Sequence, residues 1–243
     1  MNKPRRALGS LRARSLSLAV LATAVPCLLG QAAEEVPREE LVLELLFEEN
    51  LKDTSGAKHA ATANGTVTFV DGKHGKCAAF DGRSWVDTRF PQTDLGEEFT
   101  VECWVDPGER QSLHADIFGN HVGDGLGFVV QQDGASANQF FAAYGVGDKK
   151  WVMTDPASLA PGRWQHVALV KTREDLRLYL NGILVATEQD TTPARPSPMP
   201  VAVGLGYSEQ ERCFRGLIDD FRIWNEALTD FEHADIDPAA AQE

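Results

Sequence analysis

Strict alternation of apolar and polar residues recurs along this chain and limits what it can fold into. In residues 99–105 every second residue from Phe99 onward is apolar, whereas Thr100, Glu102 and Trp104 occupy the opposite face. A period of two places successive side chains on opposite sides of an extended strand, and it does not fit a helix. The sequence therefore predicts an all-β protein.

A hairpin over residues 164–188 is the clearest local unit. Leucines at positions 176, 178 and 180 alternate with other side chains, and a second apolar run begins at Ile183. Between the two runs lies Asn181-Gly182. Asn-Gly is the strongest short hairpin signal, because both residues of such a turn need positive φ.

Further short strands are expected along most of the chain, separated by turn residues such as Asp-Gly pairs. They cover residues 41–47, 66–70, 77–81, 84–88, 115–119, 126–132, 139–145, 150–154 and 201–205. Many short strands with almost no helical period favour a sandwich or a barrel. One short helix is expected near the C-terminus, where Thr229 and Glu232 have the spacing of a capping box.

Residues 1–32 have the layout of a secretory signal peptide: a basic start, a short apolar run from Leu16 to Leu29, and small residues before the cleavage point. The apolar run is too short to span a membrane, and no later segment approaches ~20 apolar residues. We therefore expect an exported protein, periplasmic or extracellular, without membrane insertion. The pair Arg5-Arg6 leaves twin-arginine export open beside the general secretory route.

The remaining length suits one domain. We expect a lead-in over residues 33–40, a single domain over residues 41–236 and a flexible tail over residues 237–243. Removal of residues 1–32 leaves 18 basic and 36 acidic residues, a net charge of −18. So negative a chain is not expected to bind nucleic acid or an anionic membrane.

Three cysteines lie in the predicted domain: Cys77, Cys103 and Cys213. Export permits a disulfide, and three cysteines allow at most one within the chain. The sequence does not choose the pair. His74 and Cys77 supply only a fragment of the four ligands that a structural zinc site requires.

Six blocks of sequence occur in an order that is typical of one family. They lie within residues 46–61, 75–82, 99–105, 162–169, 178–182 and 214–228. In this order they resemble the laminin-G-like domains of the concanavalin A-like lectin/glucanase superfamily, especially the bacterial branch related to pentraxins. The resemblance covers roughly residues 41–236. It implies a two-sheet antiparallel jelly-roll sandwich in which residues 47–56 lie near residues 216–220.

The resemblance also implies a structural calcium ion. The implied ligands are Glu48, Asp53 with its loop carbonyls, and Asp219. Calcium takes six to eight oxygen ligands and combines carboxylates with backbone carbonyls. The residues alone also allow a simpler role, in which Asp53 caps a turn and Asp219 accepts backbone hydrogen bonds at a bend.

Paired carboxylates of the kind that cleave glycosidic bonds do not occur in this sequence. Related glucanases carry their acidic residues on one strand face, as a retaining mechanism requires. Glu102, Asp106 and Glu109 come nearest, but a Pro-Gly pair interrupts the strand. Asp219 and Asp220 are neighbours on a strand and are expected to point to opposite faces. We therefore predict no enzyme, and a divergent glycoside hydrolase remains an alternative.

A concave sheet face with aromatic and hydrogen-bonding side chains can hold a sugar ring. The predicted ligand-binding residues are Glu102, Trp104, Asn120, Tyr144 and Trp151. The function predicted from the sequence is a non-catalytic binding module for a glycan or an extracellular protein. A structural or adhesive assembly domain without a small ligand is the alternative, and the oligomeric state stays open.

Overall fold

The computed structural model describes residues 40–134, 138–205 and 212–237. Contacts divide the chain into two units, Met1–Glu34 and Glu35–Glu243, and all described residues belong to the second unit. The predicted signal peptide, most of the lead-in and most of the tail lie outside the described residues. These assignments therefore stay predictions.

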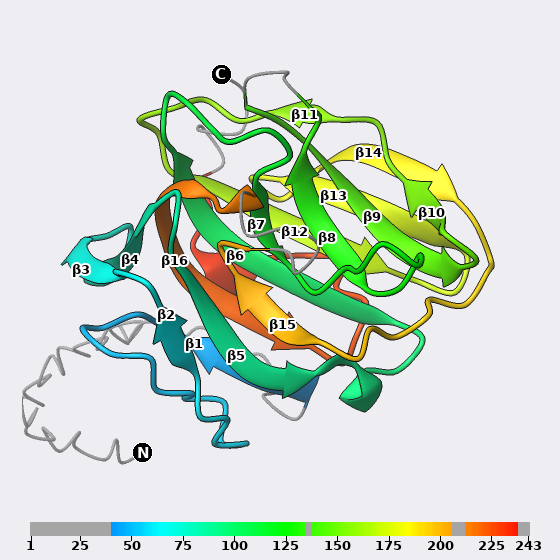
Figure 1. Cartoon of the computed structure of the whole chain (residues 1–243), viewed down its shortest axis with the longest axis horizontal. Helices are drawn as coiled ribbons and strands as arrows, with labels where there is room; N and C mark the ends of the chain where they lie inside the picture. Colours follow the sequence, from blue (N-terminus) through cyan, green and yellow to red (C-terminus); the bar gives the residue numbers. More distant parts are fainter. Residues whose placement is uncertain (1–39, 135–137, 206–211, 238–243) are drawn as a thin grey trace, which may run out of the picture. The chain divides into compact units, whose positions relative to one another are not determined.

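Eight strands form one antiparallel sheet, which we call the first sheet (Figure 1). The main path, in spatial order, is β14 (Ile183–Gln189), β13 (Asp175–Leu180), β12 (Gln165–Lys171), β6 (Phe99–Pro107), β16 (Arg215–Trp224), β4 (Lys76–Asp81) and β3 (Thr68–Asp71), with β1 (Leu41–Leu45) beside β16. β4 pairs with the first half of β16 and β1 with its second half.

Eight further strands form the second antiparallel sheet. The main path is β10 (Lys150–Met153), β9 (Gln139–Gly147), β8 (Phe128–Gln132), β7 (Asp116–Gly119), β15 (Pro200–Val203), β5 (Trp85–Pro91) and β2 (Thr62–Asn64), with β11 (Ala157–Ser158) beside β9. The strands β7, β8 and β9 follow one another in the chain and pair in that order. The two sheets confirm the predicted antiparallel sandwich.

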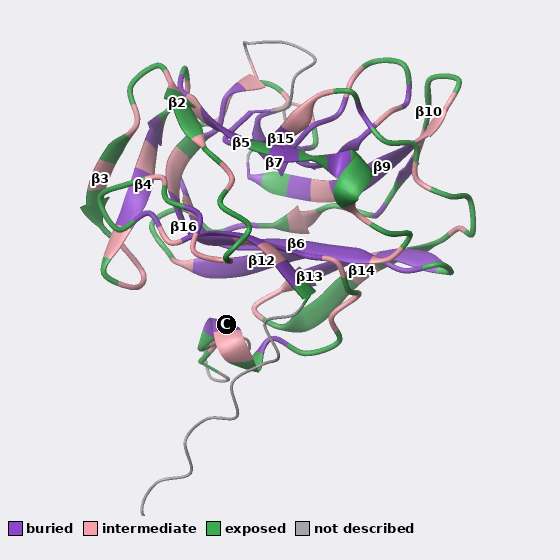
Figure 2. Ribbon diagram, turned by 90° about the horizontal axis from the view of Figure 1, so that it is seen from below, coloured by how far each residue is buried: buried purple, intermediate pink, exposed green. Residues whose placement is uncertain are grey.

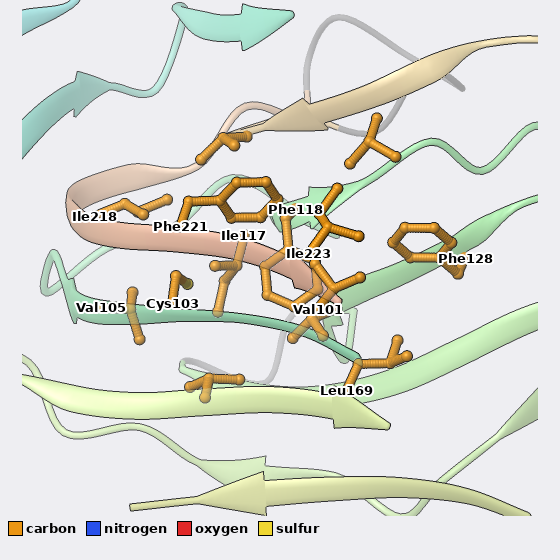
Figure 3. Packing of buried hydrophobic residues seen from close by; sticks show 14 of the residues in the cluster. Val101, Cys103, Val105, Ile117, Phe118, Phe128, Leu169, Ile218, Phe221 and Ile223 are labelled. Carbon is orange, nitrogen blue, oxygen red and sulfur yellow. The ribbon is translucent and has the colours of Figure 1, made fainter. Parts of the chain in front are cut away.

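The core lies between the two sheets, as the alternation predicts (Figure 3). Val101, Cys103 and Val105 of β6 are fully buried in it. Phe118 of β7 meets Phe221 of β16 edge to face, with ring centroids 5.7 Å apart. Such contacts between side chains from opposite sheets hold the sandwich together, because each sheet buries one apolar face.

Most predicted strands are confirmed to within a few residues. The hairpin turn has the expected left-handed backbone, with φ of 49° at Asn181 and 73° at Gly182. Strands β2 and β11 were not predicted. They contain only three and two residues, mostly exposed, so they carry no apolar alternation.

The predicted C-terminal helix is only a short 3-10 turn, η4 (Glu232–Ala234). The capping box is wrong, since Phe231 precedes the turn and no side chain caps it. Asp235 then adopts a left-handed conformation, with φ of 50°. The reason lies in tertiary contacts: the carbonyl of Ala234 accepts a hydrogen bond from Trp104 Nε1 at 3.1 Å.

Residues 225–237, which we call the C-terminal segment, cover the outer face of the first sheet (Figure 2). Phe231 and Ala234 are buried there in a second apolar cluster with Ala168, Val170 and Tyr179. The Thr100 hydroxyl donates to Glu226 O at 2.8 Å and accepts from Leu228 N at 2.9 Å. This face is therefore a second, smaller core and not an open surface.

All three cysteines of the domain are buried, and none of them forms a disulfide with another described residue. Burial raises the pKa of Cys77 to about 12 and that of Cys213 to about 11. The question of pairing that the sequence left open is thus answered for Cys77, Cys103 and Cys213.

Within residues 40–134, 138–205 and 212–237, no helix has the length and apolar character needed to cross a membrane.

Candidate functional site

A groove lies on the outer face of the second sheet, formed by the side chains that alternate with the core residues. Phe128 and Val130 of β8 point into the core, so Val129 and Gln131 point outward. The neighbouring strands β9 and β10 add outward side chains in the same way. The groove encloses about 530 Å³ and is lined by His121, Val122, Gly123, Val129, Gln131, Phe141, Ala143, Trp151, Met153 and Arg212.

Aromatic and apolar side chains form one part of this groove. Trp151 and Phe141 are partly exposed, and Met153 is 53% exposed. The Trp151 ring meets the His121 ring nearly at right angles, with centroids 5.8 Å apart and an interplanar angle of 78°. The imidazole thus supports Trp151 from its edge. An indole held in this way is a rigid platform for an apolar ring face.

Polar side chains form the rest of the groove. Gln131 Nε2 donates a hydrogen bond to Asp116 Oδ1 at 2.7 Å, and Asp116 is fully buried. His121 is also buried, and its Nε2 lies 3.5 Å from Arg212 Nη1. Burial and the positive charge of Arg212 lower the pKa of His121 to about 4. The imidazole is therefore neutral at pH 7, and the groove combines a neutral ring, an amide and a guanidinium.

Trp151 is the predicted ligand-binding residue that lines this groove. Asn120, another predicted ligand-binding residue, directly precedes His121 in the sequence. Its side chain is buried and connects three segments of the chain. It donates to Gln92 Oε1 and Met199 O, and it accepts from Phe128 N, at 3.0–3.1 Å. Its ligand-binding role stays a prediction, and its observed contacts are structural.

Tyr144 points to the other side of the second sheet, into the core. Its hydroxyl donates to Asp190 Oδ1 at 3.2 Å and to Thr192 O at 3.1 Å. Burial, followed by the charge of Asp190, raises its pKa. The ring is fully buried, so it does not line the groove.

The structure corrects the expected surroundings of Glu102 and Trp104. Both lie on the outer face of β6, as the alternation predicts, but they are 0% and 3% exposed. The C-terminal segment covers them because Phe231 and its neighbours need an apolar face to pack against. Their ligand-binding role stays a prediction, and in the described structure they contact protein groups.

Glu102 lies at the centre of a buried polar network beneath the C-terminal segment. Its Oε1 accepts hydrogen bonds from Trp224 Nε1 at 2.8 Å and from His233 Nε2 at 2.6 Å. His166 Nε2 lies 3.1 Å from the other carboxylate oxygen. His166 is thus a packed histidine inside a strand.

The three residues predicted to bind calcium hold turns in place. Asp53 accepts hydrogen bonds from the backbone N–H groups of Glu44, Ser55 and His59 at 2.9–3.1 Å. Glu48 accepts from Lys76 N. These are the contacts of carboxylates that anchor loops.

Asp219 anchors the turn between β3 and β4, because its Oδ2 accepts from His74 N at 3.0 Å. In the described residues, no three His, Cys, Asp or Glu side chains form a group that could hold a metal ion. Carboxylates are suitable calcium ligands, but Glu48, Asp53 and Asp219 do not lie close enough together to form such a group. The calcium site stays a prediction.

Asp219 and Asp220 do not point to opposite faces, so that expectation is wrong. His74 meets both of them: its backbone N–H donates to Asp219, and its Nδ1 lies 2.7 Å from Asp220 Oδ2. The cause is a bulge in β16, where the pairing with β6 shifts between Asp219 and Arg222 and Asp220 has φ of 47°.

Comparison with known proteins identifies the family of this chain. A family model, Laminin_G_3, described as the concanavalin A-like lectin/glucanases superfamily, matches residues 80–232. The chain belongs to this superfamily. The match includes β7, β8, β9 and β10, so the groove is part of the lectin/glucanase-like domain.

Curated relatives of this lectin/glucanase-like chain include pappalysin-1 from Mus musculus and Homo sapiens. The identities are 27% over 151 residues and 28% over 152 residues, and each match covers 56% of this chain. The chain spans only 9% of the length of either pappalysin.

Solved structures with this fold include binding domains. Domain 4 of AbnA, an extracellular GH43 arabinanase from Geobacillus stearothermophilus solved with arabinotriose, matches at a TM-score of 0.65 and 22% identity, covering 78% of this chain and 94% of that one. The binding domain of Paraclostridial Mosquitocidal Protein 1 matches at 0.63 and 18%, covering 79% and 50%. A structure concerned with botulinum neurotoxin type C and its interaction with two ganglioside molecules matches at 0.59 and 14%, covering 79% and 49%. At these identities the similarity establishes the fold alone.

Sequence reasoning missed most of the groove. Phe141 and Gln131 alternate with core residues, so their outward direction is readable from the sequence. What is not readable is which outward face stays uncovered. Arg212 carries no periodic signal and reaches the groove only through the fold.

Proposed function

We propose that this protein is a non-catalytic carbohydrate-binding module whose ligand lies in the groove on the outer face of the second sheet. The observation that carries the proposal is the partly exposed Trp151, held edge-on by His121 beside the amide of Gln131. Sugar rings bind by stacking an apolar face on an aromatic ring while their hydroxyls form hydrogen bonds.

The comparisons support this proposal at the level of fold. One neighbour with this fold is a domain of an arabinanase in complex with arabinotriose, and another is a toxin whose cell entry depends on gangliosides. Export to the periplasm or the outside of the cell is part of the proposal and rests on the sequence of residues 1–32. Glycans of cell walls and cell surfaces are found there.

Affinity gel electrophoresis tests the proposal with arabinan, galactan, xylan and polygalacturonate in separate gels. We expect at least one polysaccharide to retard the wild-type protein. Trp151→Ala should weaken that binding about tenfold, which corresponds to about 1.4 kcal/mol. Ile183→Ala, which removes a 45% exposed side chain from β14 of the first sheet, is the matched control and should bind normally.

Unchanged binding by Trp151→Ala would show that the groove is not the glycan site. If no polysaccharide retards the wild-type protein, and light scattering shows self-association instead, the assembly role is correct and the proposal is wrong. Thermal melting of both variants confirms that they are folded.

A further inference from the structure

Three apolar side chains of the groove lie on successive outward positions of the neighbouring strands β9 and β10. Trp151 pairs with Gly145, and Met153 pairs with Ala143. Phe141 is the next outward residue along β9, and it lines the same groove. Outward positions recur every second residue of a strand, about 7 Å apart, so the backbone positions of the first and third levels are about 14 Å apart.

Both ends of this row combine an aromatic ring with a polar side chain. At the first level the Trp151 ring meets the His121 ring, with centroids 5.8 Å apart. At the third level Phe141 pairs across the sheet with Gln131, whose amide also lines the groove. Each end therefore has the components that hold one sugar: a ring face for stacking and a partner for its hydroxyls.

Small apolar side chains form the floor between the two ends. Ala143 and Val129 pair with each other across β9 and β8, and both line the groove. Met153, which is 53% exposed, flanks them at the middle level. The groove thus offers apolar surface at all three levels, and a chain of sugar rings presents apolar ring faces of the kind that pack on such a surface.

We infer that the groove binds a linear glycan of at least three sugar units, which runs along β9 and β10 with one ring on Trp151 and another on Phe141. Adjacent sugars are joined through a single glycosidic oxygen, so rings held at backbone positions about 14 Å apart are separated by at least one further unit. This inference deepens the proposed function and rests on it. It makes Phe141 a second binding residue, and it requires more than a disaccharide to fill the groove.

Isothermal titration calorimetry tests the inference with arabino-, galacto-, xylo- and galacturono-oligosaccharides, each as a disaccharide and as a trisaccharide. In the series that binds, we expect the trisaccharide to bind the wild-type protein at least tenfold more tightly than the disaccharide, because only the trisaccharide reaches both aromatic rings. Phe141→Ala should lose about tenfold in affinity for the trisaccharide and bind the disaccharide, which is held at Trp151, as the wild-type protein does. Trp151→Ala should lose about tenfold for both.

Two further variants separate the loss of a platform from a general loss of structure. Phe141→Leu keeps an apolar side chain but removes the ring, and it should lose the same preference for the trisaccharide. Phe69→Ala, which removes a partly exposed phenyl ring from β3 of the first sheet, is the matched control and should retain the preference. Thermal melting identifies the variants that are folded.

Two results would overturn the inference and leave the proposed function intact. One is a disaccharide that binds as tightly as the trisaccharide while both depend on Trp151. The other is a trisaccharide that binds Phe141→Ala and Phe141→Leu as tightly as it binds the wild-type protein. If no chain of either length binds, or if binding does not change in Trp151→Ala, the proposed function itself is wrong, so the two failures are distinguishable.

Discussion

A buried carboxylate needs partners, and Glu102 illustrates how this fold supplies them. Burial alone would raise the pKa of Glu102, but the adjacent imidazoles of His166 and His233 lower it well below its usual range. The Trp224 indole supplies a further donor. The ionised form is thus the stable form inside the protein, and removal of its charge should be costly.

Glu102→Gln should lower the free energy of unfolding at pH 7 by about 3 kcal/mol, because an amide replaces an ionised acceptor in a buried network. A carboxyl whose pKa is lowered by folding stabilises the protein above its unfolded pKa and loses that effect as the pH falls. The difference between the variant and the wild-type protein should therefore stay nearly constant from pH 7 to about pH 5 in urea unfolding, and shrink as the pH falls below 4.5, the ordinary pKa of the carboxyl. Glu226→Gln makes the same change at an exposed position and should shift stability by less than about 0.5 kcal/mol. A similarly small effect of Glu102→Gln would contradict the role of the network.

Asp219 differs from Glu102, since burial, with the nearby charge of Asp220, raises its pKa to about 6. It nevertheless accepts hydrogen bonds from the backbone N–H groups of His74 and Asp220. Asp219→Ala should lower the free energy of unfolding by about 1–3 kcal/mol, because two buried donors lose their acceptor.

Unfolding of Asp219→Ala in EDTA and in calcium separates this anchoring role from the predicted metal site. If Asp219 acts only through its hydrogen bonds, the variant should lose the same free energy of unfolding in EDTA as in calcium. A loss that occurs only in calcium would instead support the calcium site at Glu48, Asp53 and Asp219. Asp71→Ala removes an exposed carboxylate from the β3–β4 hairpin, whose turn Asp219 anchors, and serves as the control.

At the scale of elements, the two sheets end up with different outer faces. The outer face of the first sheet is closed by the C-terminal segment, whose Phe231 packs against Tyr179 at 5.0 Å and His166 at 5.2 Å between ring centroids. The outer face of the second sheet retains the groove. The covering segment thus accounts for the difference between the two outer faces.

Phe231→Ala should lower the free energy of unfolding by about 3 kcal/mol. The reason is that the Phe231 side chain is only 4% exposed, so its removal leaves a cavity beneath the segment. Hydrogen exchange should show the loss first at the amides of Leu228 and Ala234, which donate to the Thr100 hydroxyl and to Phe231 O. Asp230→Ala, at an exposed neighbouring position, should leave both measurements unchanged. If Phe231→Ala is as stable as the wild-type protein, the segment is only loosely attached.

At the scale of the whole molecule, the apolar core and not a disulfide holds the described residues together. Cys77, Cys103 and Cys213 are all buried, and none of them forms a disulfide with another described residue. Burial raises the thiol pKa values, so very little thiolate is present near neutral pH.

A thiol-reactive probe at pH 8 should therefore leave these three cysteines unmodified in the folded protein and modify all of them after unfolding in urea. Reductant should not change the melting temperature. Peptide mass spectrometry identifies the modified positions. A melting temperature that falls in reductant would reveal a disulfide and contradict this description of the molecule.

The sequence by itself determined most of the strands, the hairpin at Asn181-Gly182 and the sandwich class. Each of these depends on local alternation or on a turn that only certain residues adopt. The same alternation correctly placed Val101 inside and Trp104 outside. Trp151 was the one predicted ligand residue that the fold brought to the groove, because its outward position on β10 was not covered.

Only the tertiary structure decided which outward faces are buried. Trp104 is covered through a hydrogen bond to Ala234, 130 residues later in the chain, and Asp219 joins Asp220 on His74 through a bulge. Arg212 likewise meets His121 from 91 positions away. Periodicity distinguishes the two faces of a strand, but whether an outward face meets solvent depends on distant segments whose packing no local pattern records.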